Sequence, residues 1–599
     1  MKKMRTLLMS LPWPDHHWPS AQIGTLAAYA KKHGFQIDAL HSHLEAAAFM
    51  GINAYEDIAY KTGPHAGEVL CAALLFPEKK QEALKYISRH LPKAEKHIVR
   101  LNRALRKIYR SVDWPKYALV GFTIHSQQLF ASLVFAQWIK RDYPDMRIIF
   151  GGQCVEGEFG SSIIELFPQV DWCVDGDGEK SFVSLLRALH KRKKKFERHI
   201  PGLIYRTDEG IKRNPCSPLL SLKGMPDPDY DHYFKTLNTH PLLNDLAITP
   251  CVPVEASRGC AYRCAFCTMS FAHNNRTRPS LEIANSIDRL CKRFCVDRFD
   301  IVATMLDLAY CNELASHLIS HKRSYKIMSA IRANTPKELL ILMKRAGILY
   351  HTIGLEAFDS SLLKKMNKGT RCIDNINILK RCEVLGIMPF GNLLINFPTE
   401  SQKEIDRSVW AMDYASSFAP PAHVSTFHLS SGSLIYHHPK KYGVCRVDRA
   451  SKLASILPKD IGKRIKLWDI GFKTKRRPND YRKFNKRLES WRKKYEKAEA
   501  NNHPLLYYSD CKDFLKIEDS RHSLRIITLE GWMREVYLFC DDIKSFDKIK
   551  KRFPDVSERT LRRTLNKLFK LKVMFNEGND WLSLAIHASP ENRRHMPFL

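Results

Sequence analysis

Apolar strands alternate with amphipathic helices twice along this chain, and no other feature of the sequence restricts its fold as strongly. The first series spans residues 1–190 and the second spans residues 251–440. A strand followed by a helix pairs in parallel with the next strand, because a parallel neighbour is reached only through a crossover connection. The sequence therefore predicts an α/β protein with two parallel sheets, and its 599 residues suit three or four domains.

The first series predicts a doubly wound, Rossmann-like sheet, whose ligands would bind at the carboxyl ends of the strands. Gly151 and Gly152 follow the fourth strand directly, where the missing side chains would let a ligand approach the backbone. Residues 43–115 interrupt the series as a largely helical insertion. The predicted strands are residues 5–11, 36–40, 118–123, 147–150 and 172–174, with helices at 20–33 and 128–141 among those between them.

The second series predicts a partial version of the eightfold α/β barrel, with its chemistry in the loops at the carboxyl ends of the strands. Its six predicted strands are residues 254–257, 298–302, 325–331, 350–355, 388–395 and 423–427. Three cysteines, Cys260, Cys264 and Cys267, follow the first of these strands directly. That loop is where a barrel of this kind would carry its reactive group.

The three cysteines have a C-x3-C-x2-C spacing. Three thiolates on a four-iron cluster leave one iron open to bind a small molecule, whereas four ligands would fill it. A zinc knuckle would require a further ligand at a second paired spacing, and the nearest later pair, Cys291 and Cys295, lies in a predicted helix. We interpret the motif as the ligands of a reactive [4Fe–4S] cluster. Zinc ligation and plain buried thiols are the alternatives.

This spacing, with Phe266 before the last cysteine, resembles the signature of the radical S-adenosylmethionine (SAM) superfamily. The resemblance implies that the open iron binds SAM and that SAM is cleaved to a 5′-deoxyadenosyl radical. The carboxylate of SAM would need a fixed cation, and Arg332, at the end of the third strand, is placed for that role. The resemblance also implies that Glu356, which ends the fourth strand, accepts hydrogen bonds from the ribose of SAM. Where relatives carry an acidic–amide pair after the second strand, this sequence has Ala-Thr-Met at 303–305. No catalytic side chain is predicted.

The small residues Thr123, Gly151 and Gly152, ahead of the cysteine motif, resemble the cobalamin-binding domain found before many radical SAM enzymes. The resemblance implies a bound cobalamin. Families that ligate its cobalt with histidine carry Asp-x-His-x-x-Gly after the first strand, and residues 15–20 here read Asp-His-His-Trp-Pro-Ser. His17 is therefore a candidate cobalt ligand. The alternative is a polar loop that caps the helix beginning near Ser20.

The remaining segments are predicted from changes in composition. Residues 191–250 are expected to be a charged, Pro-rich linker. Residues 441–505 are expected to be a basic helical segment packed on the body through an apolar stripe of Phe484, Leu488, Trp491 and Tyr495. Residues 506–599 predict three helices and a hairpin, as in a winged helix. Such a module could bind nucleic acid, but it also resembles domains in which a leader peptide adds a strand to a sheet edge.

The whole order of domains resembles the cobalamin-dependent radical SAM enzymes that mature ribosomally synthesised peptides (RiPPs). The resemblance implies C-methylation of an unactivated carbon by means of a 5′-deoxyadenosyl radical and methylcobalamin. It also implies two partners, a precursor peptide and a reductant such as flavodoxin or ferredoxin. One alternative is a peptide maturase with a non-methylating output, such as epimerisation, cyclisation or rearrangement. The remote alternative is a basic nucleic-acid-binding iron–sulfur protein.

Composition limits the other classes of function. The formal net charge is +33, which would suit nucleic acid, but the basic residues are spread along the chain, so nucleic acid is the less favoured partner. No window is long and apolar enough to predict a membrane helix. Sixteen cysteines without a secretory signal favour a reducing compartment, and we expect a cytoplasmic protein.

Overall fold

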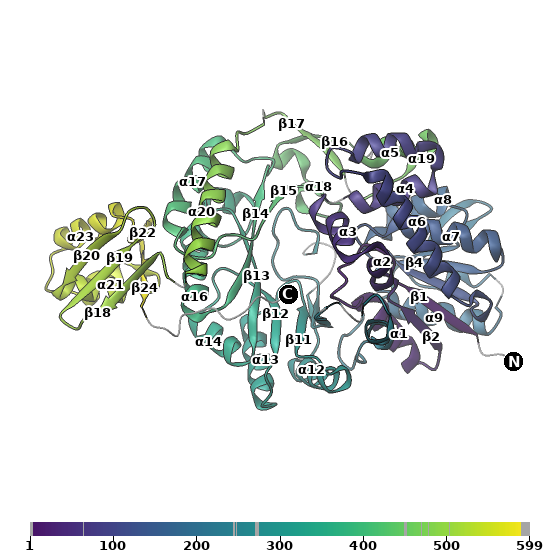
Figure 1. Cartoon of the computed structure of the whole chain (residues 1–599), viewed down its shortest axis with the longest axis horizontal. Coiled ribbons are helices and arrows are strands. Elements are labelled where there is room, and N and C mark those ends of the chain that lie inside the picture. The colour runs from purple at the N-terminus through teal and green to yellow at the C-terminus, as the bar shows by residue number, and fades with distance from the viewer. Residues whose placement is uncertain are drawn as a thin grey trace. The chain divides into compact units, whose positions relative to one another are not determined.

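The computed structural model describes residues 4–588 except 64, 194, 244, 245, 247, 270–274, 449–451, 469, 477 and 502. The chain forms two compact units (Figure 1). The first comprises Met1–Ala256, Arg276–Asp300 and Val447–Phe472, and the second comprises Ser257–Asn275, Ile301–Arg446 and Lys473–Leu599. Among the described residues, no helix combines the length and apolar character that crossing a bilayer requires.

The first unit is built on a seven-stranded sheet in the order β2-β1-β3-β4-β5-β6-β7. The first five strands pair in parallel, as predicted, and the last two pair antiparallel at one edge. The strands are β1 (Arg5–Met9), β2 (Gln36–Leu40), β3 (Leu119–Thr123), β4 (Arg147–Gly151), β5 (Trp172–Val174), β6 (Leu203–Thr207) and β7 (Gly210–Arg213).

The hairpin of β6 and β7 corrects the prediction of a linker over residues 191–250. Leu203 and Ile204 are buried against the sheet, whereas most of β7 is exposed. Charged residues such as Lys212 and Arg213 are common on edge strands, where they discourage pairing with other chains. Because these residues interrupt the apolar pattern, the hairpin reads as a connector in the sequence.

Helices cover both faces of this sheet, which confirms the doubly wound prediction. Leu8 of β1 packs on one face with residues of α1 (Ala21–Lys32) and α9 (Gly178–His190). Its neighbours Leu7 and Met9 pack on the other face with α7 (Leu129–Asp142) and α8 (Glu158–Leu166). The predicted insertion enlarges this second core and is helical throughout most of its length. It contains α2 (Ser42–Met50), α3 (Ile52–Glu56), a π-helical turn (Asp57–Lys61), α4 (Ala66–Leu75), α5 (Lys80–Ile87) and α6 (Ala94–Ser111).

The second sheet has six strands in the order β15-β14-β13-β12-β11-β8, which is the reverse of their order in the chain. The pairs from β12 to β15 are parallel, so the predicted partial barrel is confirmed. Its strands are β8 (Val252–Glu255), β11 (Arg298–Val302), β12 (Lys326–Ile331), β13 (Ile348–Glu356), β14 (Met388–Ile395) and β15 (His423–Thr426). Helices α12 (Ser280–Phe294), α13 (Leu308–Ser320), α14 (Lys337–Arg345), α16 (Cys372–Leu385) and α17 (Gln402–Ala415) alternate with them, and the short α15 (Ser360–Lys365) precedes α16.

The basic segment predicted at residues 441–505 divides between two structural contexts. Apolar residues of its first half, including Leu453 and Leu467, enter the core of the first unit. The second half forms α20 (Arg482–Ala500), which lies along α17 (Figure 1). The four residues of the predicted stripe are the buried residues of α20, and the indole N–H of Trp491 donates to the carbonyl of Phe418 at 2.9 Å. The prediction of a helix packed on the body is therefore confirmed.

The C-terminal module contains the three predicted helices and the predicted hairpin. A sheet in the order β20-β19-β18-β24 and a second sheet in the order β21-β23-β22 accompany the helices. Its described elements are β18 (Leu506–Asp510), β19 (Phe514–Asp519), β20 (Arg525–Glu530), α21 (Gly531–Phe539), β21 (Lys544–Ser545), α22 (Phe546–Arg552), α23 (Glu558–Lys570), β22 (Met574–Glu577), β23 (Asp580–Ser583) and β24 (Ile586–His587). Residues 589–599 of the predicted module lie outside the described residues.

Candidate functional site

The three cysteines lie in a loop that follows β9 (Ser257–Arg258), a two-residue strand just after β8. Two backbone hydrogen bonds attach this loop to distant parts of the second unit. The amide of Ala265 donates to the carbonyl of Met366 at 2.8 Å, and its carbonyl accepts from the amide of Ile435 at 3.1 Å. The loop is therefore held in a defined conformation by residues that lie far away in the sequence.

The spacing of the three thiols does not match a site for one ion. Zinc draws its ligands close together, since each Zn–S bond is only about 2.3 Å long. The three cysteines do not place their sulfur atoms within 4.8 Å of one another. Among the described residues, the cluster that meets this distance is Asp15, His16 and His17. Cysteines that each bind a different iron of one cluster lie farther apart than the ligands of one ion. The geometry thus fits the cluster interpretation better than the zinc alternative.

Cations lie close to the cysteine loop. Burial raises the pKa of the Cys264 thiol, and the positive charges of Lys368 and Arg332 act in the opposite direction. Positive charge near a thiol favours the thiolate, which is the form that binds iron.

Arg332 follows β12 directly, as predicted, and is buried. Its guanidinium lies 3.8 Å from the ring centroid of Tyr262 in the cysteine loop, and one of its terminal nitrogens donates to the carbonyl of Lys368. Its Nε is buried and has no hydrogen-bond partner among the described residues. A buried guanidinium with an unused donor beside the cysteine loop fits a carboxylate ligand.

Glu356 is the last residue of β13 and has a φ of +62°, in the left-handed region that side chains other than glycine rarely adopt. Its Oε1 accepts a hydrogen bond from Nζ of Lys368 at 3.0 Å, and both side chains are buried. Gly354 on the same strand leaves room for this ammonium group, because an added Cβ would clash with it. Lys368 is a site residue that the sequence analysis missed.

The end of β14 shows a similar conformation. Asn396 has a φ of +60°, and its amide donates to the hydroxyl of Tyr481 at 2.7 Å. That hydroxyl donates in turn to Glu400, and burial raises the pKa of Glu400 to about 7. Strained residues at the carboxyl ends of two neighbouring strands are typical of binding sites, where the surrounding structure has to hold them. Tyr481 and Glu400 were also missed.

Residues 303–305, after β11, offer no carboxylate or amide side chain, so the departure noted in the sequence persists in the structure. Asp307, four residues beyond Ala303, caps α13 by accepting a hydrogen bond from the amide of Tyr310 at 2.8 Å. Its carboxylate is therefore explained by helix capping.

In the first unit, Thr123 and Gly151 end neighbouring strands and face each other in register. A Cβ added to Gly151 would meet no atom within 4 Å, so the space beside this backbone is open. Gly152 has a φ of +109°, and an added Cβ would lie 2.7 Å from the carbonyl oxygen of Ile124. Gly152 is thus required by the turn itself, whereas Gly151 leaves room for a ligand to approach the backbone.

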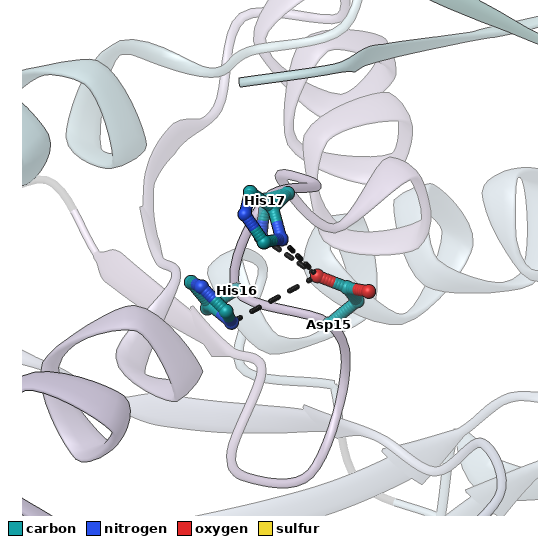
Figure 2. A group of neighbouring side chains, drawn as sticks. All are labelled: Asp15, His16 and His17. Carbon is teal, nitrogen blue, oxygen red and sulfur yellow. Dashed lines mark hydrogen bonds and ion pairs between the residues drawn. The ribbon is translucent and has the colours of Figure 1, made fainter. Parts of the chain in front are cut away.

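The loop after β1 contains the Asp15 and His17 predicted from the partial motif. Nδ1 of His17 and Oδ1 of Asp15 lie 2.9 Å apart. Figure 2 shows the two side chains pointing toward each other. The prediction that this loop caps the following helix is wrong, because α1 has no side-chain cap. The amide of Ser20 donates instead to Nδ1 of His41.

Residues 254–409 match the sequence profile of the radical SAM superfamily. This match spans β8 to α17, and the three cysteines, Arg332 and Glu356 lie within it. The prediction of a radical SAM enzyme, which uses a [4Fe–4S] cluster and SAM, is confirmed.

Among sequenced relatives, the chain is 22% identical over 449 residues to an uncharacterised methyltransferase of Pyrococcus horikoshii, covering 70% of this chain and 90% of that protein. Among solved structures, it is similar to the radical SAM methyltransferase TsrM of Kitasatospora setae with cobalamin and a [4Fe–4S] cluster bound. The TM-score is 0.51 at 16% identity, over 72% of this chain and 77% of that one.

It is also similar to the cobalamin-dependent SAM radical enzyme OxsB with aqua-cobalamin and SAM bound. Here the TM-score is 0.50 at 14% identity, over 95% of this chain and 71% of that one. At these identities the two structures support the fold, and they confirm the predicted combination of a Rossmann-like sheet with a partial barrel.

Proposed function

We propose that this chain is a cobalamin-dependent radical SAM methyltransferase that modifies a ribosomally synthesised peptide. The observation that carries the proposal is that one chain contains two parallel sheets, each with residues suited to a cofactor at the carboxyl ends of its strands. The radical SAM domain has three cysteines, Arg332 and Glu356 at the ends of its strands, and the preceding parallel sheet has an open backbone at Gly151. The solved structures of TsrM and OxsB named above are similar to this chain in fold, and both contain a bound cobalamin.

Within this proposal, Cys260, Cys264 and Cys267 bind the cluster and Arg332 binds the carboxylate of SAM. Lys368 holds the carboxylate of Glu356 in place, so that the ribose hydroxyls of SAM meet an acceptor whose position is fixed. When bound, the cluster and SAM supply a 5′-deoxyadenosyl radical, and the corrinoid supplies a methyl group. The protein's own contribution is to bind and orient these groups and to keep water away.

The proposed peptide partner is supported by the exposed edge of the C-terminal sheet. Within the described part of the chain, strand β20 is the last strand of its sheet and pairs with β19 alone, so one row of its backbone groups has no strand neighbour there. Leu524, just before β20, and Ile526, its second residue, are 65% and 56% exposed. An edge of this kind is suited to accept an added strand whose apolar side chains cover the exposed ones.

Charge around this module favours an acidic peptide. Helices α22 and α23 carry nine exposed basic residues and only two exposed acidic ones, Asp547 and Glu558. The basic residues are Lys548, Lys550, Lys551, Arg552, Arg559, Arg562, Arg563, Lys567 and Lys570. A leader segment rich in Asp and Glu would be attracted to this surface before it docks.

The hairpin of the module argues against a nucleic-acid role. Glu577, at its tip, accepts hydrogen bonds from the amide of Ile373 at 2.9 Å and from the hydroxyl of Ser360. Asp580, on the other side of the turn, forms an ion pair with Arg371 at 2.6 Å. In a winged helix that binds nucleic acid, the hairpin has to be exposed. Here the hairpin of β22 and β23 is instead bonded to residues of α15 and α16 in the barrel.

The proposal is tested with protein that is reconstituted anaerobically with iron, sulfide and cobalamin. It predicts a cobalamin absorption band beside the iron–sulfur shoulder, and formation of 5′-deoxyadenosine when a reductant and SAM are added. The variant in which all three cysteines are replaced by Ala should lose the iron–sulfur shoulder and the cleavage but retain the cobalamin band. Protein that binds no cobalamin, or that leaves SAM intact, would contradict the proposal.

The non-methylating alternative is distinguished by the mass of the product. The substrate to try is a peptide encoded beside the gene, incubated with the reconstituted enzyme. Methylation adds the mass of one methylene group, whereas epimerisation and rearrangement leave the mass unchanged. A modified peptide without this mass increase would favour the alternative.

A further inference from the structure

A carboxylate and two imidazoles converge in the loop after β1 of the first unit (Figure 2). Oδ1 of Asp15 lies 2.9 Å from Nδ1 of His17 and 3.9 Å from Nδ1 of His16. The centroids of the two imidazole rings are 4.0 Å apart. One atom from each of the three side chains can be chosen so that all lie within 4.8 Å of one another. Two ligands of one ion, bound at about 2.1 Å each, lie no more than about 4.2 Å apart, so small side-chain rotations would complete a site.

His16 contributes a buried ring nitrogen to this cluster. Its side chain is 1% exposed, and its Nδ1 is buried with no hydrogen-bond partner among the described residues. A buried polar atom without a partner costs free energy, so native proteins rarely leave one without a reason such as an unseen ion. The atom lies on the side of the ring near the Asp15 carboxylate, where such an ion would bind.

Burial and hydrogen bonding favour the forms of His16 and Asp15 that bind a metal ion. Burial lowers the pKa of His16 to about 4, so its imidazole is neutral at neutral pH. Burial acts to raise the pKa of Asp15, but hydrogen bonds from His17 outweigh it and hold the pKa below its usual value. A neutral imidazole and an ionised carboxylate can bind a cation without first losing a proton.

The backbone of the loop is held on both sides by groups of the same unit. The carbonyl of His16 accepts from the hydroxyl of Tyr233 at 2.7 Å, and the carbonyl of His17 accepts from the amide of Cys251 at 2.9 Å. Oε1 of Glu56 lies 3.9 Å from Nε2 of His16, on the far side of that ring. A carboxylate in this position can orient a ligating imidazole, as outer partners do in metal sites.

We propose that Asp15, His16 and His17 bind a divalent transition-metal ion, with Zn²⁺ as the reference ion. Two imidazoles and one carboxylate suit Zn²⁺, Co²⁺ or Fe²⁺ rather than Mg²⁺ or Ca²⁺, which prefer oxygen ligands. The side chains of Asp15 and His17 are partly exposed, so the ion has a route of entry and a coordination position open to water or another ligand. None of the three cysteines belongs to this site, and its tests require no bound cobalamin.

The first test is equilibrium dialysis of the full-length protein against Zn²⁺, with the [4Fe–4S] cluster in place so that the three cysteines are occupied. The proposal predicts one saturable equivalent of Zn²⁺ per chain. Asp15→Asn and His17→Gln should each weaken this binding at least about tenfold, since each removes or neutralises a ligand. The matched control is His33→Gln at the C-cap of α1, where the imidazole is exposed and its Nδ1 lies 2.9 Å from the carbonyl oxygen of Tyr29. It should bind Zn²⁺ like the wild type.

The second test identifies the ligands. Co²⁺ added to the protein with all three cluster cysteines replaced by Ala should give visible absorption and electron spin-echo couplings of imidazole nitrogen. These signals should disappear in His17→Gln, while circular dichroism verifies that this variant is folded. The proposal is wrong if no saturable equivalent binds or if His33→Gln weakens binding as much as His17→Gln. It is also wrong if His17 coordinates only the cobalt of added cobalamin and no free ion.

Discussion

Substitution of Arg332 should weaken SAM binding without affecting binding of the iron–sulfur cluster. Its guanidinium stacks on Tyr262 and keeps an unused donor beside the cysteine loop. Arg332→Gln removes a charge-assisted hydrogen bond worth about 1.5–3 kcal/mol, so the Kd for SAM should rise about 10- to 100-fold. Arg332→Lys should show part of this loss, because lysine keeps the charge but lacks the planar fork. The iron content and the Kd are measured on the same anaerobic samples.

The matched control for this prediction is Arg345→Gln, at the end of α14, which removes an exposed arginine of the same barrel. It should leave the Kd for SAM unchanged. If Arg332→Gln loses the cluster together with SAM binding, or binds SAM normally, the assigned role of Arg332 is wrong.

The site residues that the sequence reveals are those with a local signal. Cys260, Cys264 and Cys267 are recognisable because their spacing alone specifies the chemistry of their ligand set. Nothing around Lys368 in the sequence predicts its role, because that role depends on an ion pair with Glu356. The pair forms only when folding brings the end of β13 next to the turn before α16. Tyr481 is even less visible, because it lies 85 residues from the Asn396 amide that it binds.

At the scale of elements, the exposed edge of β20 carries the prediction about the peptide. Ile526→Asp places a carboxylate on an exposed position of this edge, so the fold should tolerate it. It should weaken binding of an acidic precursor peptide at least about tenfold, because it adds like charge and removes an apolar contact. Binding is measured by fluorescence anisotropy of labelled peptide, and formation of 5′-deoxyadenosine without peptide is measured alongside.

Leu281→Asp provides the control for the edge, since Leu281 on α12 is, like Ile526, an exposed aliphatic residue. Peptide binding should survive this substitution. Equal losses in both variants, or no loss in Ile526→Asp, would mean that the peptide does not bind along β20.

A second prediction at this scale concerns the contact between α4 and α7. Glu68 of α4 accepts hydrogen bonds from the amides of Leu129 and Phe130, both at 2.9 Å, at the start of α7. Burial raises the pKa of Glu68 to about 7, from about 4.5 when unfolded. The stability that Glu68 contributes is therefore complete below about pH 4.5 and is lost as the pH rises through 7. At about 1.4 kcal/mol per pKa unit, this loss is on the order of 3 kcal/mol.

Glu68→Gln does not titrate, so the difference in unfolding free energy between the wild type and this variant should fall between about pH 4.5 and about pH 8. Urea unfolding followed by tryptophan fluorescence measures it. The exposed Glu209, on the turn between β6 and β7, provides the control variant Glu209→Gln. A pH-independent difference for Glu68→Gln would contradict the buried-carboxylate account.

Elements were predictable where their apolar pattern was complete. β2, β5, β11 and β14 begin and end where predicted, because apolar residues recur along each of them at alternate or successive positions. β6 and β7 were missed because the edge of a sheet is half polar, and β24 was missed because two residues are too few to show a period. In both cases the pairing partner, which is distant in the sequence, decides the structure.

At the scale of the whole molecule, the chain order does not reveal which segments share a core. Residues Val447–Phe472 return to the first unit, although they follow the barrel in the sequence. Within the second unit, the C-terminal module is anchored by the buried Lys380 of α16. Its Nζ donates to the carboxylate and the carbonyl of Asp541, both at 2.7 Å, and to the carbonyl of Ser583 at 2.9 Å. The peptide-binding edge proposed here is thus part of a module attached to the barrel by buried contacts.

The measurement that tests the central claim most directly follows the methyl group of SAM. The reconstituted enzyme, supplied with cobalamin, a reductant, the precursor peptide and SAM labelled with deuterium on its methyl group, is analysed by mass spectrometry of the peptide. The account predicts a peptide in which one hydrogen on carbon is replaced by a deuterated methyl group, together with 5′-deoxyadenosine. A peptide that gains no label while 5′-deoxyadenosine accumulates, or a labelled peptide formed equally well without cobalamin, would contradict it.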